Sequence, residues 1–266
     1  MADEVCEVFM IPENSYLVLL EKTTDRVSEV TVCISLYNYE HHIEETLESV
    51  KLQTLRTLDL LVVEDRSTDD SLVVAGTWLQ ENADSFNQIK LVRHQENRGL
   101  ARARNTAILL ADTPFLFILD ADNLLYPRCI ERCLEALLAD PNAAMAYPLI
   151  EKFGEEEEVI GNVVWERSQF LVENKIDAMS LIRRSALLQV DGYSYLEAIG
   201  PLGWEDYDLW CKFFDVGLYG IPIGEILARY RTHSTSMLQS VSNQSGNIQR
   251  LHQEMKQRHP WLEVVK

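Results

Sequence analysis

The stretch Phe115-Leu116-Phe117-Ile118-Leu119-Asp120-Ala121-Asp122 places two carboxylates directly after an unbroken apolar run. A short run of this kind predicts a strand that is buried on both faces, here over residues 114–119. Open α/β sheets bind ligands beyond the carboxyl ends of their strands, which is where Asp120 and Asp122 would lie. Paired carboxylates at that position suit a hard divalent cation that also holds substrate phosphates. An acidic, solvated turn explains the same pattern, so the neighbouring motifs have to separate the two interpretations.

Apolar runs and helix-period patterns alternate on both sides of this segment. The runs predict strands at 30–36, 58–63, 89–92, 114–119 and 145–147. The periodic stretches between them predict helices at 42–52, from 67 through 79, at 100–110 and around 134–138. Strands that alternate with helices favour an α/β fold with a mostly parallel central sheet covered by helices on both faces.

The second half of the chain is less regular. We expect a hairpin tip without a metal role at the acidic run 155–158, a strand-like segment at 159–164, and helices at 178–190 and 206–216. Residues 229–240 resemble a polar loop, and 249–256 predict an outer helix. We therefore expect one domain over 29–240, with halves 29–123 and 124–240, between an N-terminal extension (1–28) and a C-terminal helical tail (241–266).

Composition narrows the classes of partner. The chain has 266 residues, 47% hydrophobic residues and a formal net charge of −18, which argues against nucleic acid and against a general anionic lipid surface. No apolar stretch is long enough to span a bilayer, and the acidic N-terminus is unlike a secretion signal. The five cysteines form no disulfide framework, and Cys33, Cys133 and Cys211 fit as core residues, so we expect a reduced, cytoplasmic setting.

Two further motifs occur in the first half. Glu64-Asp65 ends the second predicted strand and could cap the following helix, accept a hydrogen bond from a nucleobase or sugar, or do both. The stretch from Asn97 to Asn105 combines a glycine turn at Gly99, a helix start and three arginines, including Arg104. Helix N-termini and arginine forks suit phosphate, whereas a basic surface helix is the simpler alternative.

Two more motifs occur in the second half. Glu205 and Asp206 begin a predicted helix and could complement its dipole, or one of them could face a cleft as a general base. The neighbouring Trp204 could stack on a sugar or belong to the core. His233 follows Tyr230-Arg231-Thr232; an isolated histidine is more often structural than a metal ligand.

Taken in order, these motifs strongly resemble those of the family 2 glycosyltransferases, inverting enzymes of the GT-A fold, from about residue 30 to 236. The resemblance implies a nucleotide-sugar-binding half followed by an acceptor half. It implies a donor-binding set of Ser35, Tyr37, Asn38, Asp65, Asn97, Gly99, Arg104, Asp120, Ala121 and Asp122. Within that set, Tyr37 and Asp65 would hold the nucleobase, and Arg104 would lie beside the nucleotide.

The resemblance also implies the catalytic parts. Asp120 and Asp122 would form the DxD pair that contacts the ribose and holds Mn²⁺ or Mg²⁺ on the diphosphate, with His233 completing the metal site. Asp206 would be the general base, and Glu205 would position the acceptor or its loop. The expected donor is a UDP-sugar, with a dTDP-sugar as the alternative. The acceptor could be a glycan, a lipid-linked molecule, which would bring the protein to a membrane surface, a protein or a small molecule.

Some positions depart from the family pattern and leave alternatives open. Ser35 stands where the family usually has proline, Glu64 where a second Asp is frequent, and Arg66 where glycine is usual. These departures affect the identity of the nucleotide and leave the catalytic set intact. A haloacid dehalogenase-type phosphatase is disfavoured because three strand–helix units precede the Asp120 loop. The remaining alternative is a non-catalytic sugar-binding or scaffolding module of the same fold.

Overall fold

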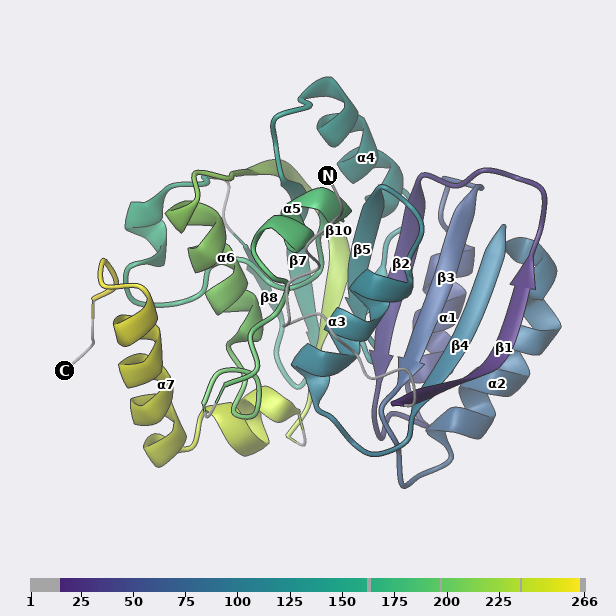
Figure 1. The fold of residues 1–266 in the computed structure, drawn as a ribbon, viewed down its shortest axis with the longest axis horizontal. Coiled ribbons are helices and arrows are strands. Elements are labelled where there is room, and N and C mark those ends of the chain that lie inside the picture. Colours follow the sequence, from purple (N-terminus) through teal and green to yellow (C-terminus); the bar gives the residue numbers. More distant parts are fainter. Residues whose placement is uncertain (1–14, 162–163, 197, 235, 264–266) are drawn as a thin grey trace, which may run out of the picture.

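The computed structural model describes residues 15–161, 164–196, 198–234 and 236–263. Ten strands in these ranges form one sheet in the order β1-β4-β3-β2-β5-β9-β7-β10-β6, with β8 paired to β7 (Figure 1). Their bounds are β1 (Tyr16–Thr23), β2 (Val30–Leu36), β3 (Leu58–Glu64), β4 (Gln88–His94), β5 (Phe115–Asp120), β6 (Leu124–Leu125), β7 (Met145–Gly154), β8 (Glu158–Ile160), β9 (Leu181–Arg183) and β10 (Gly220–Thr232). Strands β4, β3, β2 and β5 are mutually parallel, as are β7 and β10.

Helices cover both faces of this sheet, as predicted. Their bounds are α1 (Ile43–Lys51), α2 (Ser71–Asn82), α3 (Leu100–Leu110), α4 (Cys129–Ala139), α5 (Arg184–Gln189), α6 (Glu205–Asp215) and α7 (Ser245–Arg258). One core cluster joins α1, α2 and α4 to the sheet, and a second joins α3, α5, α6 and α7 to its other face. Along β2, Val32 and Ile34 belong to the first cluster and Cys33 to the second, as the alternation of a strand requires. The α/β fold prediction is confirmed.

Helix α3 is buried over most of its surface and carries polar residues into the interior. Ala101, Ala103 and Ala107 pack in the second core cluster, where their small side chains let the helix approach the strands closely. The same burial encloses Arg104 and Asn105. A buried guanidinium must find partners, and this requirement shapes the site described below.

The regular first half was predicted well, whereas parts of the second half were wrong. The helix expected over 178–190 begins only at Arg184, because Leu181 and Ile182 belong to β9, which pairs with β5 and β7. The loop expected over 229–240 begins after Thr232, because β10 continues alongside β7 to its end, and it stops before a short π-helix at Leu238–Ser242. In both places pairing with distant strands overrides the local pattern.

The hairpin tip was predicted correctly, since β7 and β8 pair antiparallel on either side of residues 155–157. The assigned extension contributes an unpredicted edge strand, β1, which pairs antiparallel with β4. The assigned tail contains α7, and Leu251 and Met255 of that helix join the second core cluster. Residues 1–14 of the extension, 162–163 of the expected strand 159–164, and 264–266 of the tail lie outside the described residues. Of the described helices, none has the length and apolarity needed to cross a membrane.

Candidate active site

The parallel strands bring the first motifs to one edge of the sheet. Ser35 of β2 lies opposite Asp120 of β5, and Leu36 lies opposite Glu64 of β3. The segments that follow these three strands therefore start side by side, at their carboxyl ends, as the sequence predicted. The segments after β2 and β5 border a cavity of about 770 Å³, whereas no residue of the segment 65–70 after β3 lines it.

The cavity gathers much of the predicted site. Its lining includes the predicted residues Ser35, Arg104, Asp120, Ala121, Asp122, Glu205 and Asp206. These residues come from β2, α3, β5 with the turn after it, and α6, so the fold unites motifs from both halves of the chain. His233 is joined to this set through Asp122, whose Oδ2 lies 3.0 Å from the His233 Nε2.

Arg104 links the two acidic motifs. Its guanidinium donates hydrogen bonds to Asp120 Oδ1 at 2.7 Å and to Glu205 Oε1 at 2.6 Å, and it lies 5.2 Å from the centre of the Tyr193 ring. Burial opposes the charge, but the two carboxylates raise the pKa of Arg104 well above its usual value. Arg104 is therefore a permanent cation that fixes Asp120 and Glu205 relative to each other.

Asp122 is the more deeply buried of the paired carboxylates. Burial, and then the charge of Asp120, raise the pKa of Asp122 to about 6, while its contact with His233 acts in the opposite direction. The described residues contain no group of three or more His, Cys, Asp or Glu side chains arranged to hold a metal ion. Two carboxylates and an imidazole are nevertheless a donor set that suits Mn²⁺, and a cation between the acids would relieve their repulsion. The residues thus fit the expected cofactor.

Asp206 lies at the start of α6, facing the same cavity. Its Oδ2 accepts a hydrogen bond from Asn174 Nδ2 at 2.8 Å, and its Oδ1 accepts one from the Tyr207 N–H at 2.7 Å. Burial, and then the adjacent Glu205 carboxylate, raise the pKa of Asp206 to about 8. A carboxylate with its pKa near neutrality is well suited to accept a proton from a bound hydroxyl group.

Some of the predicted donor-binding residues, all of them in the described part of the chain, do not line this cavity. They are Tyr37, Asn38, Asp65, Asn97 and Gly99. The Asp65 carboxylate is almost fully buried and accepts hydrogen bonds from the Arg98 and Gly99 N–H groups at 2.8 and 2.7 Å. Its backbone carbonyl accepts another from Asn97 Nδ2 at 2.9 Å. Asp65 therefore holds the loop that leads into α3, and its contact with a nucleobase stays a prediction.

The turn after β2 is braced in a similar way. Asn38 has a φ of +59°, and its Oδ1 accepts a hydrogen bond from the Thr68 N–H at 2.8 Å. Tyr37 beside it is 42% exposed on the surface. These loops are positioned by one another, and the donor-binding roles of Tyr37 and Asn38 stay predictions.

The structure adds two residues that sequence reasoning missed. Tyr39 lines the cavity, and its ring lies edge-on to that of His233 with centroids 6.1 Å apart. Asp177 also lines the cavity, and burial, followed by the charge of Asp120, raises the pKa of Asp177 to about 7. Tyr39 directly follows the recognised Tyr37-Asn38 pair, whereas nothing in the sequence around Asp177 distinguished it.

The chain is similar to several known proteins. The chain matches the model of "Glycosyl transferase family 2" over residues 31–190. Among curated proteins, it is 28% identical to "Chondroitin synthase" of Escherichia coli, over 73% of this chain and 28% of that protein. It is 27% identical to "UDP-Glc:alpha-D-GlcNAc-diphosphoundecaprenol beta-1,3-glucosyltransferase WfgD" of Escherichia coli, over 78% of this chain and 79% of that one.

Solved structures share the fold. S. aureus TarS 1-349 in complex with UDP-GlcNAc superposes with a TM-score of 0.65 at 15% identity, covering 86% of this chain and 65% of that one. The mannosyltransferase PcManGT from Pyrobaculum calidifontis, in complex with GDP-Man and Mn²⁺, superposes with a TM-score of 0.61 at 22% identity, covering 79% and 58%. The chain thus spans only part of several of the proteins that it matches. The family match extends over more than half of the chain, and the protein belongs to glycosyltransferase family 2.

Proposed function

We propose that this protein transfers a sugar from a nucleoside diphosphate sugar, a UDP-sugar, to an acceptor hydroxyl group with inversion at the anomeric carbon. One observation carries this proposal: the Asp120–Asp122 pair and Asp206 line the same cavity and are connected through Arg104 and Glu205. A donor and an acceptor bound there would lie between a phosphate-binding edge and a proton acceptor.

The relatives support the choice of donor. The name of WfgD specifies UDP-Glc, and the TarS structure contains UDP-GlcNAc. PcManGT contains GDP-Man, so the fold also accommodates another base, and a dTDP-sugar remains the alternative suggested by the departures at Ser35 and Glu64. The lining gives no comparable guide to the acceptor, and we propose a cytoplasmic protein that meets a membrane only through a lipid-linked acceptor.

Each group has a defined task in the proposed reaction. Asp206 takes the proton of the acceptor hydroxyl as that oxygen attacks the anomeric carbon, and the bond from this carbon to the diphosphate oxygen breaks on the opposite face. Arg104 keeps Asp120 and Glu205 in fixed positions. Asp120, Asp122 and His233 would hold Mn²⁺ or Mg²⁺, which would supply positive charge for the leaving diphosphate.

The test is calorimetric titration of UDP and dTDP, each with Mn²⁺ and with EDTA, on wild type and on Asp122→Ala. We expect metal-dependent binding of UDP that is lost in the variant. Release of UDP from UDP-glucose or UDP-GlcNAc then distinguishes an enzyme from a binding module. Metal-dependent UDP binding without turnover on any acceptor favours the non-catalytic alternative, and binding of neither nucleotide contradicts the proposed donor.

A further inference from the structure

Asn174 is held in one orientation at the edge of the cavity. It lies between the short 3₁₀ helix Arg167–Phe170 and strand β9. Its Oδ1 accepts a hydrogen bond from the Ile176 N–H at 3.1 Å, and its Nδ2 donates to Asp206 Oδ2 at 2.8 Å. If the amide were rotated by half a turn, its Nδ2 donor would face the Ile176 N–H donor, and its Oδ1 acceptor would face the Asp206 Oδ2 acceptor. The local turn therefore directs the N–H donor of Asn174 toward the carboxylate.

Asp206 is thus restrained at both oxygens. The Tyr207 N–H at the start of α6 holds Oδ1, and the Asn174 side chain holds Oδ2. The first donor is backbone and is fixed by the helix, whereas the second comes from a loop 32 residues earlier in the chain. The orientation of the carboxylate toward the cavity depends on this loop.

We propose that Asn174 is a positioning residue that orients the Asp206 carboxylate for proton transfer and stabilises its ionised form. This inference rests on the role of Asp206 in the proposed function. A hydrogen bond donated to a carboxylate favours its charged state, whereas burial disfavours it. Asn174 donates a hydrogen bond to the Asp206 carboxylate without adding charge, whereas the neighbouring Glu205 and Asp177 repel that carboxylate when they are ionised.

The charges around Asp206 make this donor important. Burial, then Glu205, and also Asp177 raise the pKa of Asp206, and Arg104 lowers it. Tyr193 and Cys211 also interact electrostatically with the carboxylate and are kept neutral, because burial raises the pKa of both groups. Without Asn174, two of these groups would still stabilise the ionised form of Asp206, namely Arg104 and the Tyr207 backbone N–H.

Two substitutions distinguish the hydrogen bond that Asn174 donates to Asp206 from the local turn that its Oδ1 forms with the Ile176 N–H. Asn174→Asp keeps an oxygen for the Ile176 N–H but presents an acceptor to Asp206. Asn174→Ser keeps a shorter oxygen that can still form the local turn but does not reach the base. Asn142→Asp, at an exposed turn after α4, makes the same chemical change away from the cavity and is the matched control.

The first readout is UDP release from UDP-glucose and UDP-GlcNAc with Mn²⁺ as a function of pH. We expect the acid limb of kcat to move upward by about one pH unit in Asn174→Ser and further in Asn174→Asp. KM for the donor and the affinity for UDP should stay near their wild-type values, and Asn142→Asp should match wild type. Unchanged limbs, or a loss of kcat that is equal at every pH, would overturn the proposal.

A second readout needs no substrate. Urea unfolding at about pH 9 compares the effect of Asp206→Asn in the wild-type background with its effect in the Asn174→Ser background. We expect Asp206→Asn to be more stabilising in the second background, because the ionised carboxylate has lost its donor. Equal effects in both backgrounds contradict the inference, even where Asp206→Asn abolishes turnover and the proposed function stands.

Discussion

Asp206 and Asp208 lie two residues apart on helix α6, yet the protein treats them in opposite ways. Asp206 faces the cavity beside other acids, and burial together with Glu205 raises its pKa to about 8. Asp208 is completely buried, and burial alone would raise its pKa, but hydrogen bonds and cations around it lower the pKa far below the usual value. The two pKa values differ because the two sides of the helix have different neighbours.

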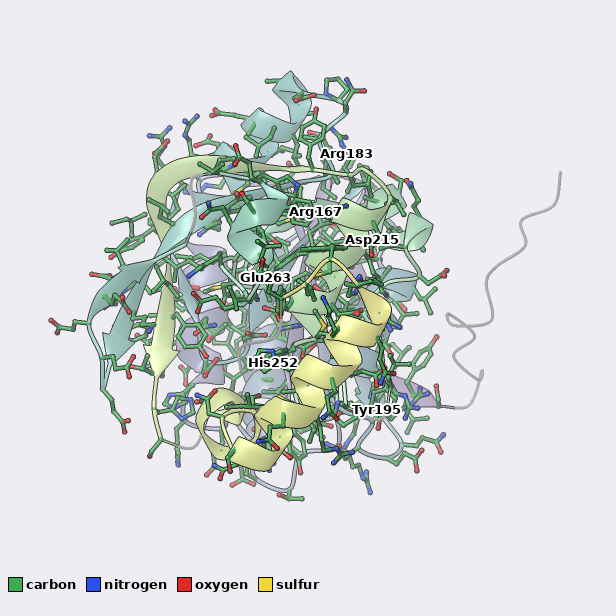
Figure 2. All side chains as sticks on the ribbon, turned by 90° about the vertical axis from the view of Figure 1, so that its left-hand side faces the viewer. Arg167, Arg183, Tyr195, Asp215, His252 and Glu263 are labelled. Atoms are coloured by element: carbon green, nitrogen blue, oxygen red, sulfur yellow. The ribbon has the colours of Figure 1, made fainter. Side chains whose placement is uncertain are left out.

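The side of α6 that carries Asp208 packs against the C-terminal part of the chain. Asp208 accepts hydrogen bonds from Arg258 at 2.6 Å and from the Ser194 hydroxyl at 2.5 Å, and it lies 3.1 Å from His259 Nε2. About two turns further along α6, Asp215 lies 2.5 Å from His259 Nδ1. Figure 2 looks onto α7 and places Asp215 beside the C-terminal end of that helix.

Successive residues of a helix are separated by 100°, so residues two apart point in very different directions. One direction carries Asp208 to buried, oppositely charged and hydrogen-bonding partners, and the other carries Asp206 to a cavity where ligands can enter. A carboxylate in the first setting stabilises the fold, whereas one in the second retains chemical reactivity at a cost in stability. The comparison predicts that substitutions at the two positions affect different properties.

The largest expected effect is on turnover. Asp206→Asn should lower kcat by ~10²–10⁴, because the amide cannot accept the acceptor's proton. UDP binding should be retained, since Asn is neutral like protonated Asp. The melting temperature near neutral pH should change little, because the single amide oxygen of Asn keeps one of the two hydrogen bonds, from Asn174 or from the Tyr207 N–H. Steady-state kinetics with calorimetry checks both halves. A kcat equal to that of the wild type in this variant would show that Asp206 is not the general base.

Asp208→Asn should chiefly affect stability. It leaves Arg258 without its buried counter-charge and the His259 ring without one of its hydrogen-bond partners, and breaking a buried ion pair costs about 3–5 kcal/mol of unfolding free energy. Urea denaturation measures this loss. Asp215→Asn is the matched control: Asp215 is partly exposed, and its removal should cost about 1 kcal/mol or less. Equal losses at the two positions would contradict the assignment of Asp208 as the centre of the cluster.

The smaller effects are differences in pH dependence. The lowered pKa of Asp208 contributes stability above its ordinary pKa, which is lost as the pH falls toward the folded value. The raised pKa of Asp206 has the opposite sign: ionisation is disfavoured in the folded state, so stability falls as the pH rises toward about 8. Activity should rise over that same range as the base ionises. Unfolding curves below about pH 4 test the sign at Asp208, and unfolding curves with rate profiles between about pH 5 and pH 9 test the sign at Asp206. A rate that falls with pH over the second range would oppose Asp206 as base.

Much of the first half could be predicted because local pattern and tertiary role agree there. Strands β2, β3 and β5 are short apolar runs that are buried on both faces, and each ends at a recognisable polar motif. The second half could be predicted less well. Strand β9 spans only Leu181–Arg183, and its identity as a strand comes from pairing with β5 and β7. A run that short carries no periodicity of its own.

The same division applies to the site. Asp120, Asp122, Glu205 and Asp206 stand in motifs and were predicted as candidates from the sequence. Asn174 and Asp177 stand in no motif, and only the fold brings their loop to the cavity. Asp65 illustrates the converse, because its motif was recognised but its hydrogen bonds to the Arg98 and Gly99 N–H groups depend on two segments that meet in space.

By itself, the sequence determined the alternation of strands and helices, the family resemblance, and the acids at the carboxyl ends of the strands. These properties follow from hydrophobic period and from motifs within a few residues of one another. Tertiary structure alone decided that Arg104 joins Asp120 to Glu205, that Asn174 holds Asp206, and that Asp206 and Asp208 differ in pKa. Hydrogen bonds, desolvation and charge pairing depend on distances between residues remote in sequence, and only the folded chain sets those distances.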